Sequence, residues 1–136
     1  MKNLSILMLC IIMSGPIVIA QKNLTEKFQK NPDNGNAVIK WHQTTYDFKK
    51  VEQLKPIKAV FLFENTGDVP LTIIAVRPQC GCTATDYPKN PILPGEKSKI
   101  TLTYNASKKG VFNKSATVVS NSKKGNHLLI IKGEVQ

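Results

Sequence analysis

The residues best suited to chemistry are two cysteines separated by one glycine, Cys80-Gly81-Cys82, in the stretch RPQCGCTATDYP. Paired cysteines form disulfides, exchange electrons with other thiols or bind soft metals. In an extended strand, residues two apart have Cα atoms about 6.6 to 6.8 Å apart, whereas a disulfide prefers roughly 5.5 to 6 Å. We therefore expect Gly81, which lacks a Cβ atom, to let the backbone bend and bring the two sulfur atoms together.

Three interpretations of this pair remain open at the level of sequence. The first is a structural disulfide formed in an oxidising compartment. The second is a redox-exchanging pair whose thiolate the nearby Arg77 favours, although no thioredoxin-like βαβ pattern surrounds it. The third is a Cu(I) site at Cys80 and Cys82, since two thiolates can suffice for that ion.

A zinc site fits the sequence less well, because a structural zinc ion needs four ligands. His42 and His127 are interpreted as ordinary surface or strand histidines. Motifs of conventional catalysis are also missing from the sequence, which contains no G-x-S-x-G, no H-E-x-x-H and no glycine-rich phosphate loop. We therefore expect a protein that is not an enzyme and that has no metal or cofactor, with copper as the alternative.

The first twenty residues, MKNLSILMLCIIMSGPIVIA, are typical of a cleavable signal peptide. Lys2 supplies the positive start, and an apolar run precedes a small residue, Ala20. The apolar run is too short and too interrupted for a spanning helix, which needs roughly 18 to 20 residues. Cleavage after Ala20 removes Cys10 and leaves an even pair of cysteines. We expect an exported protein, periplasmic or extracellular, with no membrane span after cleavage.

The formal charge of +10 comes almost entirely from lysine, because Arg77 is the only arginine. Nucleic-acid binding favours arginine forks and aromatic platforms for bases, and the sequence offers neither. We expect a solvated basic surface and no nucleic-acid partner. Attraction to anionic envelope polymers or lipid headgroups is the alternative.

Residues 21–36 are polar and rich in asparagine, so we expect a flexible N-terminal tail before one domain over residues 37–136. The domain contains about seven segments typical of short strands, at residues 38–41, 45–48, 57–63, 71–76, 99–104, 112–119 and 128–135. Regular spacing of such segments predicts an all-β, antiparallel, immunoglobulin-like sandwich. Pro88, Pro91 and Pro94 predict a loop that crosses between the sheets.

Alternation along these segments also predicts the core. The expected buried residues are Phe61, Phe63, Leu71, Ile73, Val76, Ile100, Leu102, Tyr104, Val118 and Ile130. Trp41 is expected to cover the edge of the sandwich.

Four short motifs resemble those of a family of exported bacterial immunoglobulin-like domains, the domain-of-unknown-function family numbered fifteen seventy-three. They are F-x-F-x-N-T-G (61–67), C-G-C-T (80–83), P-I-x-P-G-E (91–96) and I-K-G-E-V (131–135), and the resemblance covers residues from about 45 to 135. It implies the immunoglobulin-like fold and export. Modules of similar outline bind partners without catalysis, and the family has no assigned activity.

The expected function is therefore a non-catalytic module for protein binding or assembly in the bacterial cell envelope, with an unknown envelope protein as partner. The candidate partner-binding loop surrounds the expected bend at the cysteines and comprises Arg77, Gly81, Thr83, Asp86 and Tyr87. The alternative is a thiol-redox or Cu(I)-binding accessory protein that uses the Cys80-Gly81-Cys82 pair.

Overall fold

The computed structural model describes residues 35–136, and the predicted signal peptide and most of the predicted tail lie outside that range. The described residues form eight strands and no helix. The strands are β1 (Ile39–Trp41), β2 (Thr45–Val51), β3 (Ile57–Asn65), β4 (Ile73–Pro78), β5 (Thr83–Asp86), β6 (Lys97–Tyr104), β7 (Gly110–Ser120) and β8 (Asn126–Val135).

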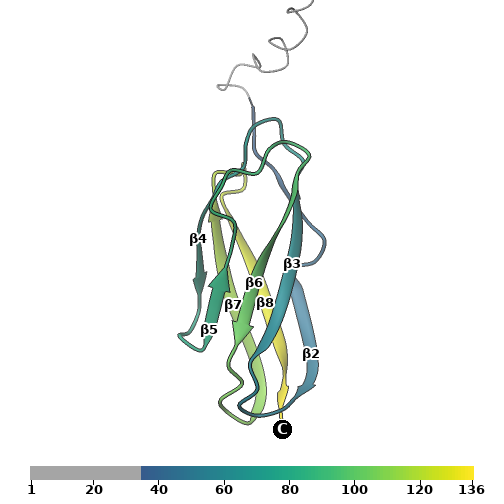
Figure 1. Ribbon diagram of the computed structural model, residues 1–136, viewed down its shortest axis with the longest axis vertical. Helices are drawn as coiled ribbons and strands as arrows, with labels where there is room; N and C mark the ends of the chain where they lie inside the picture. Colours follow the sequence, from purple (N-terminus) through teal and green to yellow (C-terminus); the bar gives the residue numbers. More distant parts are fainter. Residues whose placement is uncertain (1–34) are drawn as a thin grey trace, which may run out of the picture. The chain divides into compact units, whose positions relative to one another are not determined.

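The strands make two four-stranded sheets, β1-β3-β6-β5 and β2-β8-β7-β4, which face each other as a sandwich (Figure 1). Alternation sets the inner faces. Along β3, for example, Ala59, Phe61 and Phe63 are fully buried while the residues between them are exposed. The predicted all-β sandwich is therefore present, with β5 as a strand that the sequence did not predict.

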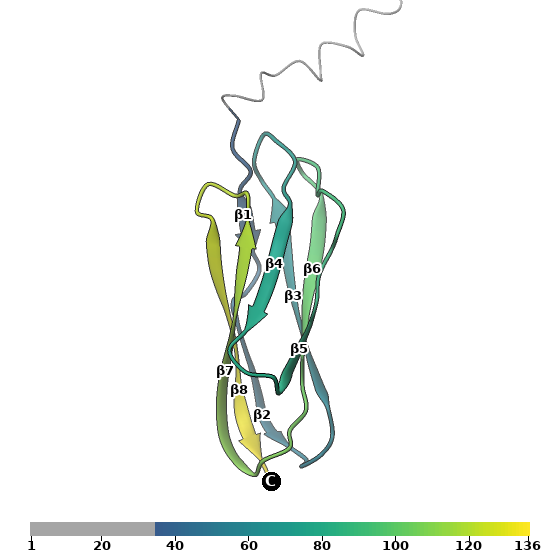
Figure 2. The same ribbon diagram turned by 90° about the vertical axis from the view of Figure 1, so that its left-hand side faces the viewer.

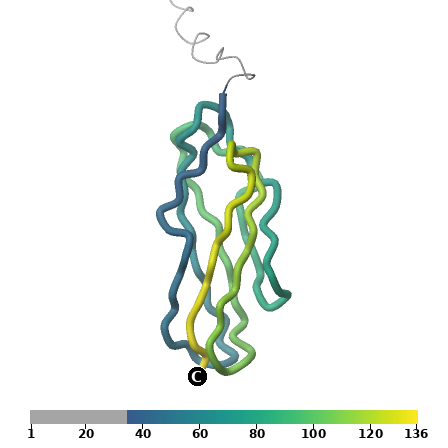
Figure 3. The backbone as a smooth tube through the Cα atoms, turned by 180° about the vertical axis from the view of Figure 1, so that it is seen from behind, coloured from purple at the N-terminus to yellow at the C-terminus, as the bar shows by residue number. Residues whose placement is uncertain are grey.

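The N-terminal part of the domain changes sheets. β1 pairs antiparallel with β3, and after a short connection β2 pairs parallel with β8, with Thr45 opposite Ile130 (Figure 3). The prediction of a purely antiparallel sandwich is wrong for this one pair. Residue alternation reports which face a side chain occupies but carries no information on the direction of the neighbouring strand.

The core matches the predicted one except at Ile130. In β8, Leu129 and Ile131 are fully buried, whereas Ile130 is half-buried on the opposite face. Residues 128–131 are all apolar, so the sequence alone does not show which of them face the core. The register is set by pairing with β7. Trp41 is half-buried, and its ring lies 5.1 Å from that of Phe63 at the edge of the core.

The crossing between the sheets is not where the prolines predicted it. The loop that contains Pro88, Pro91 and Pro94 connects β5 to β6, which are neighbours in one sheet. The crossing nearest to this loop runs from β4 to β5 through residues 79–82, where the two edge strands lie on the same side of the sandwich (Figure 2). The predicted crossing loop was wrong because the short strand β5 had not been recognised.

Asn65, in the F-x-F-x-N-T-G motif, joins three segments in the core. Its side-chain amide donates to the carbonyl oxygens of Val69 (2.8 Å) and Ile92 (2.9 Å), and its carbonyl accepts from Gly67 N (3.0 Å). The side chain is fully buried, so these bonds replace the water that it loses on folding. A Cβ atom on Gly67 would collide with the backbone of Asn36 and Val38.

The other two motifs outside the cysteine pair also serve the fold. In P-I-x-P-G-E, Gly95 has φ +83°, a left-handed conformation that favours glycine. The Glu96 carboxylate accepts from Leu93 N at 2.8 Å and closes that turn. In I-K-G-E-V, a Cβ atom on Gly133 would lie 2.9 Å from the ring of Phe112. These motifs are explained by packing and turn geometry.

Candidate functional site

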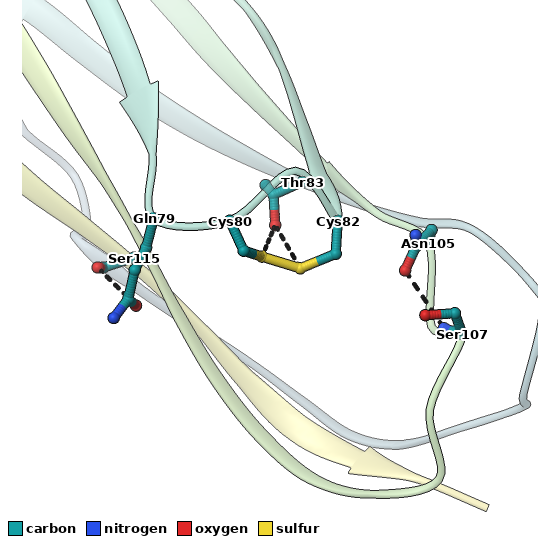
Figure 4. Close-up of a disulfide and its surroundings, with 7 residues drawn as sticks. All are labelled: Gln79, Cys80, Cys82, Thr83, Asn105, Ser107 and Ser115. Carbon is teal, nitrogen blue, oxygen red and sulfur yellow. Dashed lines mark hydrogen bonds between the residues drawn. A yellow bond between two sulfur atoms is a disulfide. The ribbon is translucent and has the colours of Figure 1, made fainter.

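The cysteine pair lies in the turn that crosses between the sheets (Figure 4). Cys80 and Cys82 are joined as a disulfide, and their Cα atoms are 5.3 Å apart. A flat strand would hold them about 6.6 to 6.8 Å apart, so the turn supplies the shorter separation. The bond closes a loop of only three residues and connects no two distant parts of the chain.

Backbone hydrogen bonds fix this turn on both sides. Gln79 N donates to Ser115 O on β7 at 2.9 Å, which attaches the start of the turn to one sheet. Asn105 N, just after β6, donates to Cys82 O at 3.1 Å and attaches its end to the other sheet. The Ser115 hydroxyl also donates to the Gln79 side-chain oxygen at 3.2 Å. The turn is thus positioned without help from the disulfide.

Gly81 does not have the steric role that the sequence suggested. Its φ lies outside the left-handed region, and a Cβ atom added there would have no neighbour within 4 Å. The bend is made by the turn as a whole, so an alanine would also fit. Gly81 is exposed and both cysteines are half-buried.

The side chain of Thr83 lies near both sulfur atoms. Its hydroxyl lies 3.9 Å from Cys80 Sγ and 4.0 Å from Cys82 Sγ, as Figure 4 shows. The residue is only 4% exposed, so it belongs to the base of the turn and not to a contact surface. Its inclusion in a partner-binding loop was wrong in that respect, because the segment 83–86 is the edge strand β5 and Thr83 faces inward.

The remaining predicted site residues surround the turn. Arg77 at the end of β4 and Asp86 at the end of β5 are exposed. Tyr87 is half-buried against the core, and the Lys89 ammonium lies 3.2 Å from the centre of its ring. The Thr85 hydroxyl donates to Val76 O at 3.4 Å, which links the two edge strands. The predicted partner-binding residues thus lie near one another around the turn, with Thr83 and Asp86 in the edge strand β5 and not in a loop.

Within residues 35–136 there is no group of three or more histidine, cysteine and acidic residues that could hold a metal ion. In the disulfide, neither sulfur is a thiolate, so Cu(I) would need the reduced pair. His127 is not available as a helper ligand, because both of its ring nitrogens have protein partners.

A second polar cluster, which the sequence did not predict, lies around His127. Trp41 Nε1 donates to His127 Nδ1 at 3.2 Å, and His127 Nε2 lies 3.0 Å from Ser122 Oγ. The Ser122 and Ser120 hydroxyls are 2.9 Å apart, and Ser120 also donates to Gly125 O at 3.1 Å. These residues are separated along the chain by up to 86 positions, so no spacing in the sequence could reveal them.

The serine–histidine contact in this cluster is not a nucleophile with its base. The indole N–H of Trp41 can only donate, so His127 Nδ1 must accept and the ring proton must sit on Nε2. An Nε2–H group facing Ser122 cannot take a proton from its hydroxyl. Burial, and next the charge of Lys124, lower the pKa of His127 below its usual value and favour this neutral form.

The arrangement of the two sheets defines the class of the molecule as an immunoglobulin-like β-sandwich. More specifically, the chain belongs to the family described as "Protein of unknown function (DUF1573)", whose model matches residues 39–135. The family resemblance expected from the motifs is thereby confirmed at the level of the family.

Solved structures support the fold. A protein of unknown function from Porphyromonas gingivalis W83 is similar with a TM-score of 0.63 and 15% identity, over 72% of this chain and 46% of that one. This chain thus spans less than half of that protein. The ASH/PapD-like domain 7 of human CEP192 is similar with a TM-score of 0.58 and 11% identity, over 99% of this chain and 98% of that domain.

The VesB protease of Vibrio cholerae is similar over 74% of this chain but only 32% of its own length, with a TM-score of 0.55 and 9% identity. Identities this low show the shared fold alone. No curated protein matches the chain. Between residues 35 and 136, the structure has no helix of the length and apolar character that crossing a membrane requires.

Proposed function

We propose that this chain is a non-catalytic, exported immunoglobulin-like module that binds or helps to assemble another protein in the bacterial cell envelope. Its binding site is the crossing turn, Gln79–Cys82, together with the adjacent edge strands β4 and β5. The signal-like residues 1–20 and the even cysteine pair that remains after cleavage support export.

The observation that carries this proposal is that the cysteine pair in the crossing turn has no evident role in holding the fold together. Asn65, Gly67 and Gly95 are each explained by packing or turn geometry. The C-G-C turn, by contrast, is already held on both sides by backbone hydrogen bonds, and Gly81 has open space around it. A cross-linked turn that the fold does not need is best explained by contact with another molecule.

The adjoining edge strands offer the means of binding. Among residues 35–136, β4 and β5 are the last strands of their respective sheets, so each has one side without a neighbouring strand from this part of the chain. Partners commonly add a strand to such an edge. The β2 edge is less suitable, because its register is broken between Asp47 and Lys50 and its lysines are exposed.

Site-specific photocrosslinking in the native host tests this function. A photoreactive amino acid replaces exposed Ala84 on β5 in one variant and exposed Val111 on β7 in a matched control. The expected result is a discrete protein adduct from position 84 and none from position 111. Identical adducts from both positions, or none from position 84, would contradict the proposed site.

A further inference from the structure

The Cys80–Cys82 disulfide gives the fold little of the stabilisation that a structural disulfide usually gives. A disulfide stabilises a fold chiefly by restricting the unfolded chain, and the effect grows with the length of the loop that it closes. The Cys80–Cys82 bond spans two positions in sequence, so that effect is near its minimum. The hydrogen bonds of Gln79 and Cys82 to the two sheets fix the turn independently.

The two sulfur atoms differ in their surroundings. Cys82 packs against the hydrophobic core, whereas Cys80 is not among the residues that contact it. Gly81 between them has no side chain and is exposed, and the turn lies at the side of the sandwich (Figure 1). An incoming thiolate therefore has its more open approach at Cys80 Sγ, with Cys82 as the leaving group.

Thr83 supplies a hydrogen-bond donor at the right place for such a reaction. Its hydroxyl lies within 4.0 Å of both sulfur atoms on a side chain that is buried and thus held in position. A hydroxyl in this place can donate to the thiolate that forms when the bond opens. Hydrogen bonds to a charged acceptor are stronger than those to a neutral one, so this contact favours the leaving Cys82 thiolate.

From these contacts we propose that the Cys80–Cys82 disulfide undergoes thiol–disulfide exchange with a bound polypeptide that carries a pair of cysteines. This step rests on the proposed function for its site and adds the chemistry of the partner. One partner thiolate attacks Cys80 Sγ, forms a mixed disulfide and releases Cys82 as a thiolate. The second partner thiolate then attacks the partner sulfur of that bond and releases Cys80.

The reaction is balanced without any further reagent. The partner's two thiols become one disulfide, and the disulfide of this chain becomes two thiols, with two electrons and two protons passing from the partner to Cys80 and Cys82. The module thereby introduces a disulfide into its partner once per binding event. Each module acts stoichiometrically unless another disulfide in the same compartment reoxidises it.

The exchange is tested with the oxidised chain lacking residues 1–20 and a synthetic peptide that contains two reduced cysteines. Intact masses are followed after acid quenching and alkylation. We expect the peptide to become oxidised in step with the appearance of two alkylated cysteines in the protein. A peptide that stays reduced while the protein keeps its disulfide would overturn the proposal.

Single variants test the assigned order of attack. Cys82→Ser leaves only the Cys80 thiol, and Cys80→Ser leaves only the Cys82 thiol; each is mixed with a small aromatic disulfide. We expect Cys82→Ser to form the mixed disulfide about tenfold faster, because its remaining sulfur is the more open one. Equal rates, or rates equal to those of the urea-unfolded variants, would contradict a built exchange site.

Thr83→Val tests the hydrogen-bond donor in the otherwise unchanged oxidised protein. We expect exchange to slow about fivefold, as for the loss of one hydrogen bond, while the thermal transition confirms that the domain is folded. If Thr83→Val exchanges at the original rate, the proposed role of Thr83 as a donor is wrong. If Thr83→Val does not fold, the test uses Thr83→Ser, which keeps the hydroxyl and must retain the original rate.

Failure of exchange can be distinguished from failure of the proposed binding function. The photocrosslink from position 84 is repeated in the Cys80→Ser/Cys82→Ser double variant. An adduct that persists in a protein incapable of exchange, together with a peptide that stays reduced, retains the binding function and removes the exchange. If the peptide is oxidised but no adduct forms in cells, the exchange chemistry is retained and the proposed binding function is removed.

Discussion

Trp41 on β1 donates its indole N–H to Nδ1 of His127 on β8, at 3.2 Å and across 86 positions of sequence. The contact ties the short first strand of one sheet to the last strand of the other. It also fixes which nitrogen of His127 is protonated, because two donors cannot face each other. The stability of this end of the domain should therefore depend on the protonation of a single histidine.

The first prediction concerns pH. Burial lowers the pKa of His127 in the folded chain below the 6.5 usual for histidine, so between the folded and the unfolded pKa the unfolded chain binds more protons. The stabilisation is fully present above about pH 6.5 and declines as the pH falls through the lowered pKa of the folded state. Urea unfolding from about pH 7.5 to about pH 5 should show this decline.

The matched control for this prediction is the other histidine. His42 is exposed and has none of these contacts, so His42→Gln should keep the pH dependence, whereas His127→Gln should reduce it. An unchanged decline in the His127 variant would assign the effect to other groups. Asp47, whose pKa the Lys49 backbone N–H lowers below 3.8, acts in a more acidic window.

The second prediction concerns Asn65. Asn65→Ala removes the hydrogen-bond partner of the Val69 and Ile92 carbonyls and of Gly67 N, and should lower the free energy of unfolding by about 3 kcal/mol. Asn126→Ala, at an exposed position on β8, should change it by less than about 0.5 kcal/mol. Urea titration monitored by Trp41 fluorescence measures both, and similar losses in the two variants would refute the role given to Asn65.

The third prediction separates two glycines. Gly67→Ala should destabilise the domain by about 2 kcal/mol or more, because the new Cβ atom meets the backbone of Asn36 and Val38. Gly81→Ala meets nothing and should stay within about 0.5 kcal/mol of the original chain. Thermal unfolding of the two variants measures both changes in stability. A large loss of stability in Gly81→Ala would restore the conformational role that the sequence suggested for this glycine.

The fourth prediction concerns the disulfide as a cross-link. The Cys80→Ser/Cys82→Ser variant should lose no more than about 1.5 kcal/mol of stability, since the closed loop is very short. Its far-ultraviolet circular dichroism should remain that of a β sandwich. A loss of several kcal/mol, measured by urea titration, would mean that the disulfide is structural and that the turn depends on it.

Much of the fold could be predicted from single segments. Ile100, Leu102 and Tyr104 alternate with polar residues, and all three are buried as expected. The sequence TATD of β5 has no such alternation, and it is a strand only because it pairs with β6. The run 128–131 is apolar throughout, so its register came from β7. Properties that depend on a neighbouring strand could therefore not be predicted from single segments of the sequence.

The same division applies to the candidate site. Two cysteines one residue apart were visible as a local signal, and their position next to a bend was correct. Their location at a crossing between the sheets depends on which strands pair. The hydrogen bonds that Ser115 and Asn105 make to the turn join residues far apart in the sequence. The cluster of Trp41, Ser122 and His127 gave no sequence signal at all for the same reason.

The claim on which the whole account depends is that the native module carries an oxidised Cys80–Cys82 pair. The most direct test is the intact mass of the protein isolated from its host with alkylating reagent present from lysis, before and after reduction. We predict a population with the mass of residues 21–136 that carries no alkyl group before reduction and two after it, beside any modules that have already exchanged. The absence of this oxidised population, or a bound metal in place of the disulfide, would contradict the claim.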